Sequence, residues 1–197
     1  QYREDSSVVA GPGGQKEILL GLGKKDEFNR RRVILNLRKA VFLAKQNKIK
    51  TLTVSFKEWL SHAAFLGAQE MARLMAENFE LANFEFVKYK TPTKEGWDFL
   101  EEILLYGDLA EEVKKEFKRG QTVSDEVNKC RDLVNTPGGE MTPWSLARAA
   151  KSAAGKADGL KVKVLEAAEM RRLKMGGILG VAQGSVEKPK FIIMEHK

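Results

Sequence analysis

The chain has 197 residues, 43% of them hydrophobic, so it can form one large domain or one domain with part of another. No stretch reaches the eighteen or so consecutive apolar residues that a membrane-spanning helix needs, and the first residues do not resemble a signal peptide. The single cysteine, Cys130, excludes an internal disulfide and suits a reducing cytoplasm. Because Cys130 lies among apolar positions of an expected helix, a buried, inert thiol is favoured over a reactive one. We therefore expect a cytoplasmic protein without a membrane partner.

The net charge of +7 is concentrated in one segment. Ten basic and two acidic residues lie between Lys24 and Lys50, a net +8, which leaves −1 for the rest of the chain. Arg31, Arg38 and Lys45 are spaced seven apart on a helix expected at 26–47, so they form one stripe. Such a stripe can contact a polyanion or another subunit, but we favour the alternative of a solvated helix face.

The first half of the chain reads as an α/β domain. Residues 1–16 are polar and glycine-rich, so a loop or frayed terminus is expected there. The apolar spacing then predicts strand, helix, strand, helix, strand and strand, at 17–22, 26–47, 51–56, 64–81, 84–89 and 99–106. The strand–helix–strand order predicts that the first two strands form a parallel pair.

A long helical pattern at 108–135 resembles a bridge between two domains, and Gly120 is expected to bend or break it. Thr142-Pro143 is a typical helix start, and strand, helix and strand follow at 160–165, 167–173 and 190–195. This predicts a second α/β sheet. Two or three strands cannot bury both faces of such a sheet, so this part should pack against additional protein.

Motif analysis identifies no catalytic or metal-binding residue. Gly21-Leu22-Gly23 follows a strand, but Asp26 stands where a dinucleotide fingerprint needs its third glycine, so a tight turn is favoured. The segment 176–184 contains Gly176, Gly177, Gly180 and Gly184, which are interpreted as permitting close backbone packing. Only two histidines occur, His62 and His196, and neither has a paired ligand spacing.

Two segments together resemble the leucyl (cytosol) aminopeptidase family. They are Arg131-Asp132-Leu133-Val134-Asn135-Thr136-Pro137 and Gly176-Gly177-Ile178-Leu179-Gly180-Val181-Ala182-Gln183-Gly184-Ser185, followed by the apolar Phe191-Ile192-Ile193-Met194. The resemblance implies a macro-like amino-terminal domain with a mixed, mostly parallel sheet at 1–107. It further implies an interdomain helix at 108–135 and an incomplete start of the peptidase domain at 136–197.

The resemblance also implies a cytosolic hexamer that uses two divalent ions, manganese or zinc, to release amino-terminal residues such as leucine from peptides. The family's metal ligands lie in a lysine–aspartate segment and an Asn-Thr-Asp-Ala-Glu-Gly-Arg motif, and neither is found in this sequence. No catalytic or metal role is therefore assigned to any residue. We expect this chain to hold no metal, to be inactive alone, and to have a structural role together with the remainder of the peptidase domain. Because some members bind DNA, a nucleic-acid- or partner-binding module using the helix at 26–47 is the alternative.

Overall fold

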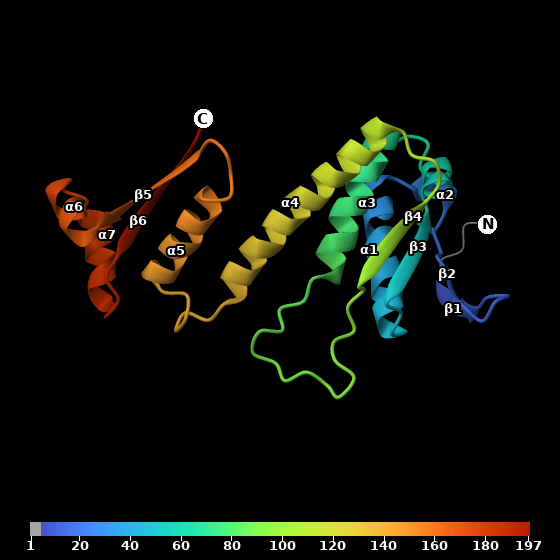
Figure 1. Ribbon diagram of the computed structural model, residues 1–197, viewed down its shortest axis with the longest axis horizontal. Coiled ribbons are helices and arrows are strands. Elements are labelled where there is room, and N and C mark those ends of the chain that lie inside the picture. The colour runs from blue at the N-terminus through green and yellow to red at the C-terminus, as the bar shows by residue number, and fades with distance from the viewer. Residues whose placement is uncertain (1–4) are drawn as a thin grey trace. The chain divides into compact units, whose positions relative to one another are not determined.

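The structure is a computed structural model that describes residues 5–197 (Figure 1). Its contacts divide the chain into an N-terminal unit, up to Cys130, and a C-terminal unit, Arg131–Lys197. Each unit contains both helices and strands, and the sheet at the centre of the N-terminal unit is parallel. The predicted α/β class is therefore confirmed.

The core of the N-terminal unit is a helix pair packed on a two-stranded parallel sheet. Helix α1, Arg30–Gln46, runs beside α3, Ala68–Asn83, and the sheet pairs β3, Thr51–Ser55, with β4, Glu102–Tyr106 (Figure 1). Helix α1 begins where the Asn29 side chain accepts a hydrogen bond from the amide of Arg32, at 3.1 Å, as an N-cap does. The two helices contribute most of the fully buried side chains, which are Val33, Leu37, Val41, Met71, Leu74 and Met75. Predicted helices at 26–47 and 64–81 are thus found, each beginning four residues later.

The N-terminal segment forms a hairpin. Strand β1, Ser7–Ala10, pairs antiparallel with β2, Lys16–Leu19, and Gly14 supports the connecting turn with a φ of 80°. The loop expected for residues 1–16 is therefore wrong for β1, while residues 1–4 lie outside the described part. The parallel pair expected of 17–22 and 51–56 is also wrong, because β2 pairs with β1 and β3 pairs with β4. The order strand–helix–strand in the sequence did not reveal which strand pairs with β3.

The chain between β3 and β4 differs from the prediction in two places. A short helix, α2, spans Phe56–His62, and the Ser55 side chain caps it by accepting from the amide of Glu58, at 3.3 Å. The strand predicted at 84–89 is wrong: this segment is irregular. Asn83 fixes its course by bonding both the amide and the carbonyl of Leu100, at 3.0 and 2.8 Å. The strand expected within 99–106 is confirmed as β4.

Helix α4 spans Glu111–Asn135 without interruption, so the expected break at Gly120 is wrong. A Cβ atom added to Gly120 would lie 2.7 Å from the Arg73 carbonyl oxygen and 2.9 Å from the Ala76 Cβ of α3. Gly120 therefore permits the close approach of two helices. Cys130 is exposed, which makes the expected buried thiol wrong. It lies about 80° around the helix from Gly120.

The C-terminal unit contains a two-stranded antiparallel sheet and short helices. Strand β5, Leu160–Glu166, pairs with β6, Lys190–His196, and α6, Ala167–Arg172, follows β5. These elements and α5, Pro143–Ala154, confirm the predicted order, and Thr142 caps α5 by accepting from the amide of Ser145, at 3.2 Å.

The glycine-rich segment of this unit is helical. It forms α7, Gly176–Val181, and a 3₁₀ turn, η2, at Ala182–Gly184. An added Cβ on any of its four glycines would meet no atom within 4 Å. Close backbone packing is therefore not the role of these glycines among the described residues. No helix in residues 5–197 combines the length and the hydropathy needed to cross a bilayer.

Replacing Gly120 with alanine should destabilise the N-terminal unit by about 1–3 kcal/mol, because the new methyl group overlaps the backbone of α3. This cost opposes the roughly 1 kcal/mol that alanine normally gains over glycine within a helix. Urea unfolding followed by circular dichroism measures the difference. Gly180→Ala in α7 is the matched control, since its Cβ meets open space, and it should be neutral or stabilising. If Gly120→Ala is also stabilising, α3 and α4 do not approach closely at this point.

Candidate functional site

The structure places Arg31, Arg38 and Lys45 on α1 but gives them different surroundings. The Nε atom of Arg38 donates to Oδ1 of Asn78 on α3, at 2.8 Å. Arg31 is exposed on the first turn of the helix. The three residues therefore lie on one helix, but they do not form one uniformly exposed basic surface.

Lys45 is the most enclosed of the three, with 12% of its side chain exposed. Its ammonium group lies 2.5 Å from a carboxylate oxygen of Glu85, donates to the carbonyl of Asn83 at 3.3 Å, and lies 5.6 Å from the ring centre of Phe99. Lys45 thus ties α1 to the irregular segment that follows α3. Binding of a polyanion or another subunit by Arg31, Arg38 and Lys45 stays a prediction. Of the three side chains, Arg31 is the one that remains exposed for such a contact without a role in joining α1 to its neighbours.

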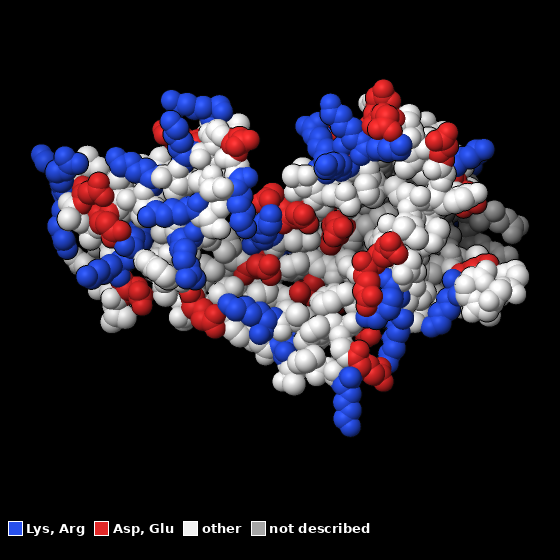
Figure 2. Space-filling model, viewed as in Figure 1, with Lys and Arg blue, Asp and Glu red and all other residues white. Residues whose placement is uncertain are grey.

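The net charge of each folded unit differs from what the basic segment at 24–50 suggests. Residues 1–130 carry 22 basic and 20 acidic residues, a net +2, because acidic residues elsewhere in the unit offset the basic segment. Residues 131–197 carry 12 basic and 7 acidic residues, a net +5. On the face drawn in Figure 2, basic side chains gather over the region of α5 to β6. Most of the excess positive charge therefore belongs to the C-terminal unit.

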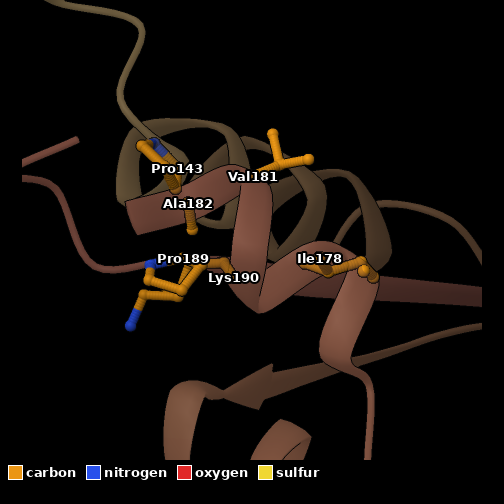
Figure 3. Close-up of a pocket in the computed structure, with 7 residues that line it drawn as sticks. Pro143, Ile178, Val181, Ala182, Pro189 and Lys190 are labelled. Atoms are coloured by element: carbon orange, nitrogen blue, oxygen red, sulfur yellow. The ribbon is translucent and has the colours of Figure 1, made fainter. Parts of the chain in front are cut away.

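A shallow apolar hollow of about 380 Å³ lies within the C-terminal unit (Figure 3). The start of α5, helix α7 with the η2 turn, and the start of β6 surround it, through Pro143, Gly177, Ile178, Val181, Ala182, Pro189 and Lys190. The two prolines come from opposite ends of this unit's sequence, and the fold brings them to one place. Sequence reasoning missed this hollow, and the only available signal was the apolar character of Ile178–Ala182 beside the glycines.

Large apolar side chains of the same unit remain uncovered. Val181 is 88% exposed and Trp144 55% exposed, whereas the buried apolar residues of the described C-terminal unit are Ala147, Leu165 and Met170. A two-stranded sheet with three short helices cannot cover more apolar surface than this. The hollow and its surroundings therefore have the composition of a surface that packs against further protein.

The residues present do not fit a two-metal centre. Among residues 5–197, no three His, Cys, Asp or Glu side chains come together in an arrangement that could hold a metal ion. Divalent ions such as zinc and manganese need several such ligands around one position. No catalytic step is therefore derived from a metal on this chain.

Comparison with known proteins matches the two units to two domains of one family. Residues 4–93 match the N-terminal domain of the cytosol aminopeptidase family, and residues 128–197 match its catalytic domain. The chain belongs to the cytosol aminopeptidase family. This confirms the resemblance found in the sequence motifs.

Several relatives are described as probable cytosol aminopeptidases. The protein of Geotalea uraniireducens is 34% identical over 186 residues, and that of Alkaliphilus metalliredigens is 30% identical over 186 residues. These matches cover 93% and 92% of this chain but 36% of each relative. The chain thus spans about a third of the length of the relatives that it matches.

Solved structures agree with the assignment. A mutant of tomato leucine aminopeptidase superposes with a TM-score of 0.84 at 27% identity, over 99% of this chain and 38% of that protein. The bottromycin maturation enzyme BotP, in complex with manganese, gives a TM-score of 0.77 at 22% identity, over 96% and 38%. The second likeness concerns the fold alone.

One carboxyl group of the N-terminal unit has an unusual environment. Glu80, on α3, is half-buried, and burial raises the pKa of its carboxyl above the ordinary value of 4.5, with the negative charge of Asp125 adding to the rise. The folded state therefore holds this proton more tightly than the unfolded state. Its stabilising contribution is complete below pH 4.5 and is lost as the pH rises through the raised pKa.

Glu80→Gln should accordingly stabilise the chain at pH 7, by less than about 1 kcal/mol because solvent screens this half-exposed group. The gain should shrink towards zero below about pH 4, where the wild-type carboxyl is protonated in both states. Urea unfolding at a series of pH values measures the trend. Glu187→Gln, in an exposed turn, is the control. A gain that does not depend on pH would contradict the assigned cause.

Lys45→Met should lower the free energy of unfolding by about 1–2 kcal/mol, since it removes the contacts to Glu85 and Asn83 while it keeps the apolar stem. Arg31→Met on the same helix is the control, and it should change stability by no more than about 0.5 kcal/mol. Thermal and urea unfolding of both variants give the comparison. Equal effects at the two positions would show that Lys45 behaves as an ordinary surface cation.

Proposed function

We propose that this chain forms the non-catalytic portion of a two-metal leucyl aminopeptidase, an enzyme that releases amino-terminal residues from peptides. In this proposal residues 1–107 are the amino-terminal domain, 108–135 the interdomain helix and 136–197 the beginning of the peptidase domain. The chain itself has a structural and assembly role. Family membership and the match of both of its domains support this division of labour.

The observation that carries the proposal is the uncovered apolar hollow of the C-terminal unit. A folded unit with so few buried apolar residues gains little free energy from its own core. Exposed groups such as Val181 and Trp144 are stabilised when further protein removes them from water. The remainder of a peptidase domain is the partner that the family assignment supplies, and homo-oligomer formation, as a hexamer, would add further contacts.

The metal chemistry follows from the same proposal. Two divalent ions, manganese or zinc, would polarise the scissile carbonyl and supply a bridging hydroxide. Residues of the peptidase domain outside 1–197 would hold them, since the residues described here do not fit that role. The manganese complex of BotP is consistent with this assignment for a protein of the same fold.

The purified 1–197 chain should release no product from leucine p-nitroanilide, even with millimolar manganese or zinc, because residues 5–197 bring together no ligand set for the ions. The assay is the absorbance of released nitroaniline. Metal-dependent turnover by this chain alone would overturn the proposal.

Reconstitution tests the role of the hollow. A polypeptide that carries the remaining catalytic region of the Geotalea relative should gain peptidase activity when it is mixed with this chain. Val181→Asp, at the hollow, should reduce the recovered activity at least tenfold, whereas Val186→Asp, fully exposed and outside the hollow, should reduce it less. Both variants should leave the stability of the isolated chain within about 0.5 kcal/mol of the wild type. Equal loss in both variants would contradict a specific role for the hollow.

A further inference from the structure

A second hollow, in the N-terminal unit, lies between the loop after β2 and the side of α1. It has a volume of about 380 Å³, and its lining residues are Gly21, Leu22, Gly23, Glu27, Arg32, Leu35, Asn36 and Lys39. Its lining is mostly polar and charged, unlike that of the apolar hollow in the C-terminal unit. The volume lies within the range of about 300–1,000 Å³ that small-molecule sites occupy.

The spacing of residues along α1 explains why this hollow is basic. Positions 32, 35, 36 and 39 are separated by three or four residues, so their side chains lie above one another on one face of the helix. That face meets the Gly21–Gly23 loop. It is distinct from the face that carries Arg31, Arg38 and Lys45, which the charge pattern had suggested as a binding stripe.

Asn36 is the unusual member of the lining. Only 7% of the residue is exposed, and its side-chain amide makes no hydrogen bond within residues 5–197. No fully buried side-chain nitrogen or oxygen in the described residues lacks a partner, so the amide atoms of Asn36 belong to the accessible part of this residue. Asn78, the other buried asparagine of the helix pair, is bonded through both its oxygen and its nitrogen: it accepts from Arg38 and donates to the Leu74 carbonyl, both at 2.8 Å. The polar atoms of Asn36 therefore face the hollow, where a ligand or water can bond to them.

The charges around the hollow favour an anion. Lys39 is half-buried and has no carboxylate partner in the described part of the chain. Arg32 lies 3.3 Å from the carboxylate of Glu27, which also lies 3.7 Å from Lys24. These ion pairs are half-exposed and therefore weak, so Arg32 can exchange Glu27 for a ligand at little cost. Two lining cations against one carboxylate leave the hollow positive.

The Gly21–Gly23 loop adds backbone donors. The Gly21 amide is occupied by the Ser6 hydroxyl, at 2.8 Å, but the amides of Leu22 and Gly23 donate to no acceptor within residues 5–197. Gly23 has a φ of 81°, which an L-residue rarely adopts. Successive free amides next to a left-handed residue form the kind of concave surface that binds anions.

We propose that this hollow binds the phosphate group of a small phosphate ester. Lys39, Arg32 and the Asn36 amide bond the phosphate oxygens together with the loop amides, while Leu35 contacts the organic part. A phosphate group alone would fill only part of the volume, which favours an ester over the free ion. The absence of a dinucleotide fingerprint is consistent with this assignment, because most donors here are side chains of α1 and not the amides of a helix start.

Titration calorimetry of the 1–197 chain with phenyl phosphate tests the proposal, with phenol as the probe that lacks phosphate and inorganic phosphate as the probe that lacks the ester. Phenyl phosphate should bind, and phenol should not. Lys39→Gln should weaken binding at least tenfold. Arg31→Gln, which removes the same charge from the same helix outside the hollow, should change it less than twofold. Binding should also weaken as salt is increased.

Asn36→Leu provides an independent check. Since the Asn36 amide makes no bond to the protein, this variant should fold with unchanged or higher thermal stability while its affinity for phenyl phosphate falls at least fivefold. Tighter binding of phenyl phosphate than of inorganic phosphate would support the ester, and equal binding of the two would support the phosphate site while overturning the ester part. No binding of phenyl phosphate at millimolar concentration, or equal binding by wild type, Lys39→Gln and Asn36→Leu, would overturn the site altogether.

Discussion

The packing of α1 against α3 is the interaction on which the N-terminal unit depends. Val33, Leu37 and Val41 on one helix meet Met71, Leu74 and Met75 on the other, and all are fully or almost fully buried. The same pairing fixes the polar contacts, since Arg38 reaches Asn78 only because the two helix faces touch. It also determines which side of α1 is left for solvent and ligands. Because the apolar face of α1 packs against α3, the charged residues on its other side are left to face solvent.

The two units differ in how far they bury their apolar side chains. The N-terminal unit covers its parallel sheet with long helices and encloses a continuous core. The C-terminal unit has an antiparallel pair of strands with α5 and the short helix α6 beside it, and few of its apolar side chains are buried. Its apolar residues follow the periodicity of buried elements, but the protein that would bury them is not part of residues 131–197. This difference is consistent with the proposed dependence of the C-terminal unit on further protein.

Local signals in the sequence predicted most of the elements. Thr142-Pro143 and the apolar spacing of α1, α3 and α5 identified the helices because capping and periodicity depend on near neighbours. Strand pairing was less predictable. The neighbours of β2 and β3 depend on contacts that are distant in the sequence, and the segment 84–89 alternates like a strand but is held in an irregular path by Asn83 and Lys45.

The sites were less predictable still. Spacing alone grouped Arg31, Arg38 and Lys45, but two of the three are used to join α1 to its neighbours. The Gly21–Gly23 loop lacks a dinucleotide fingerprint in the sequence. Its relation to Asn36 and Lys39 depends on which face of α1 the loop meets, and that is a property of the tertiary structure.

The exposure of Cys130 has a practical consequence. The chain contains one thiol, it lies on the surface of α4, and it takes part in none of the contacts that define the core. A maleimide fluorophore or spin label will therefore attach at a single defined position of the natural sequence. Such a reporter can follow the association of this chain with other polypeptides without any engineered cysteine.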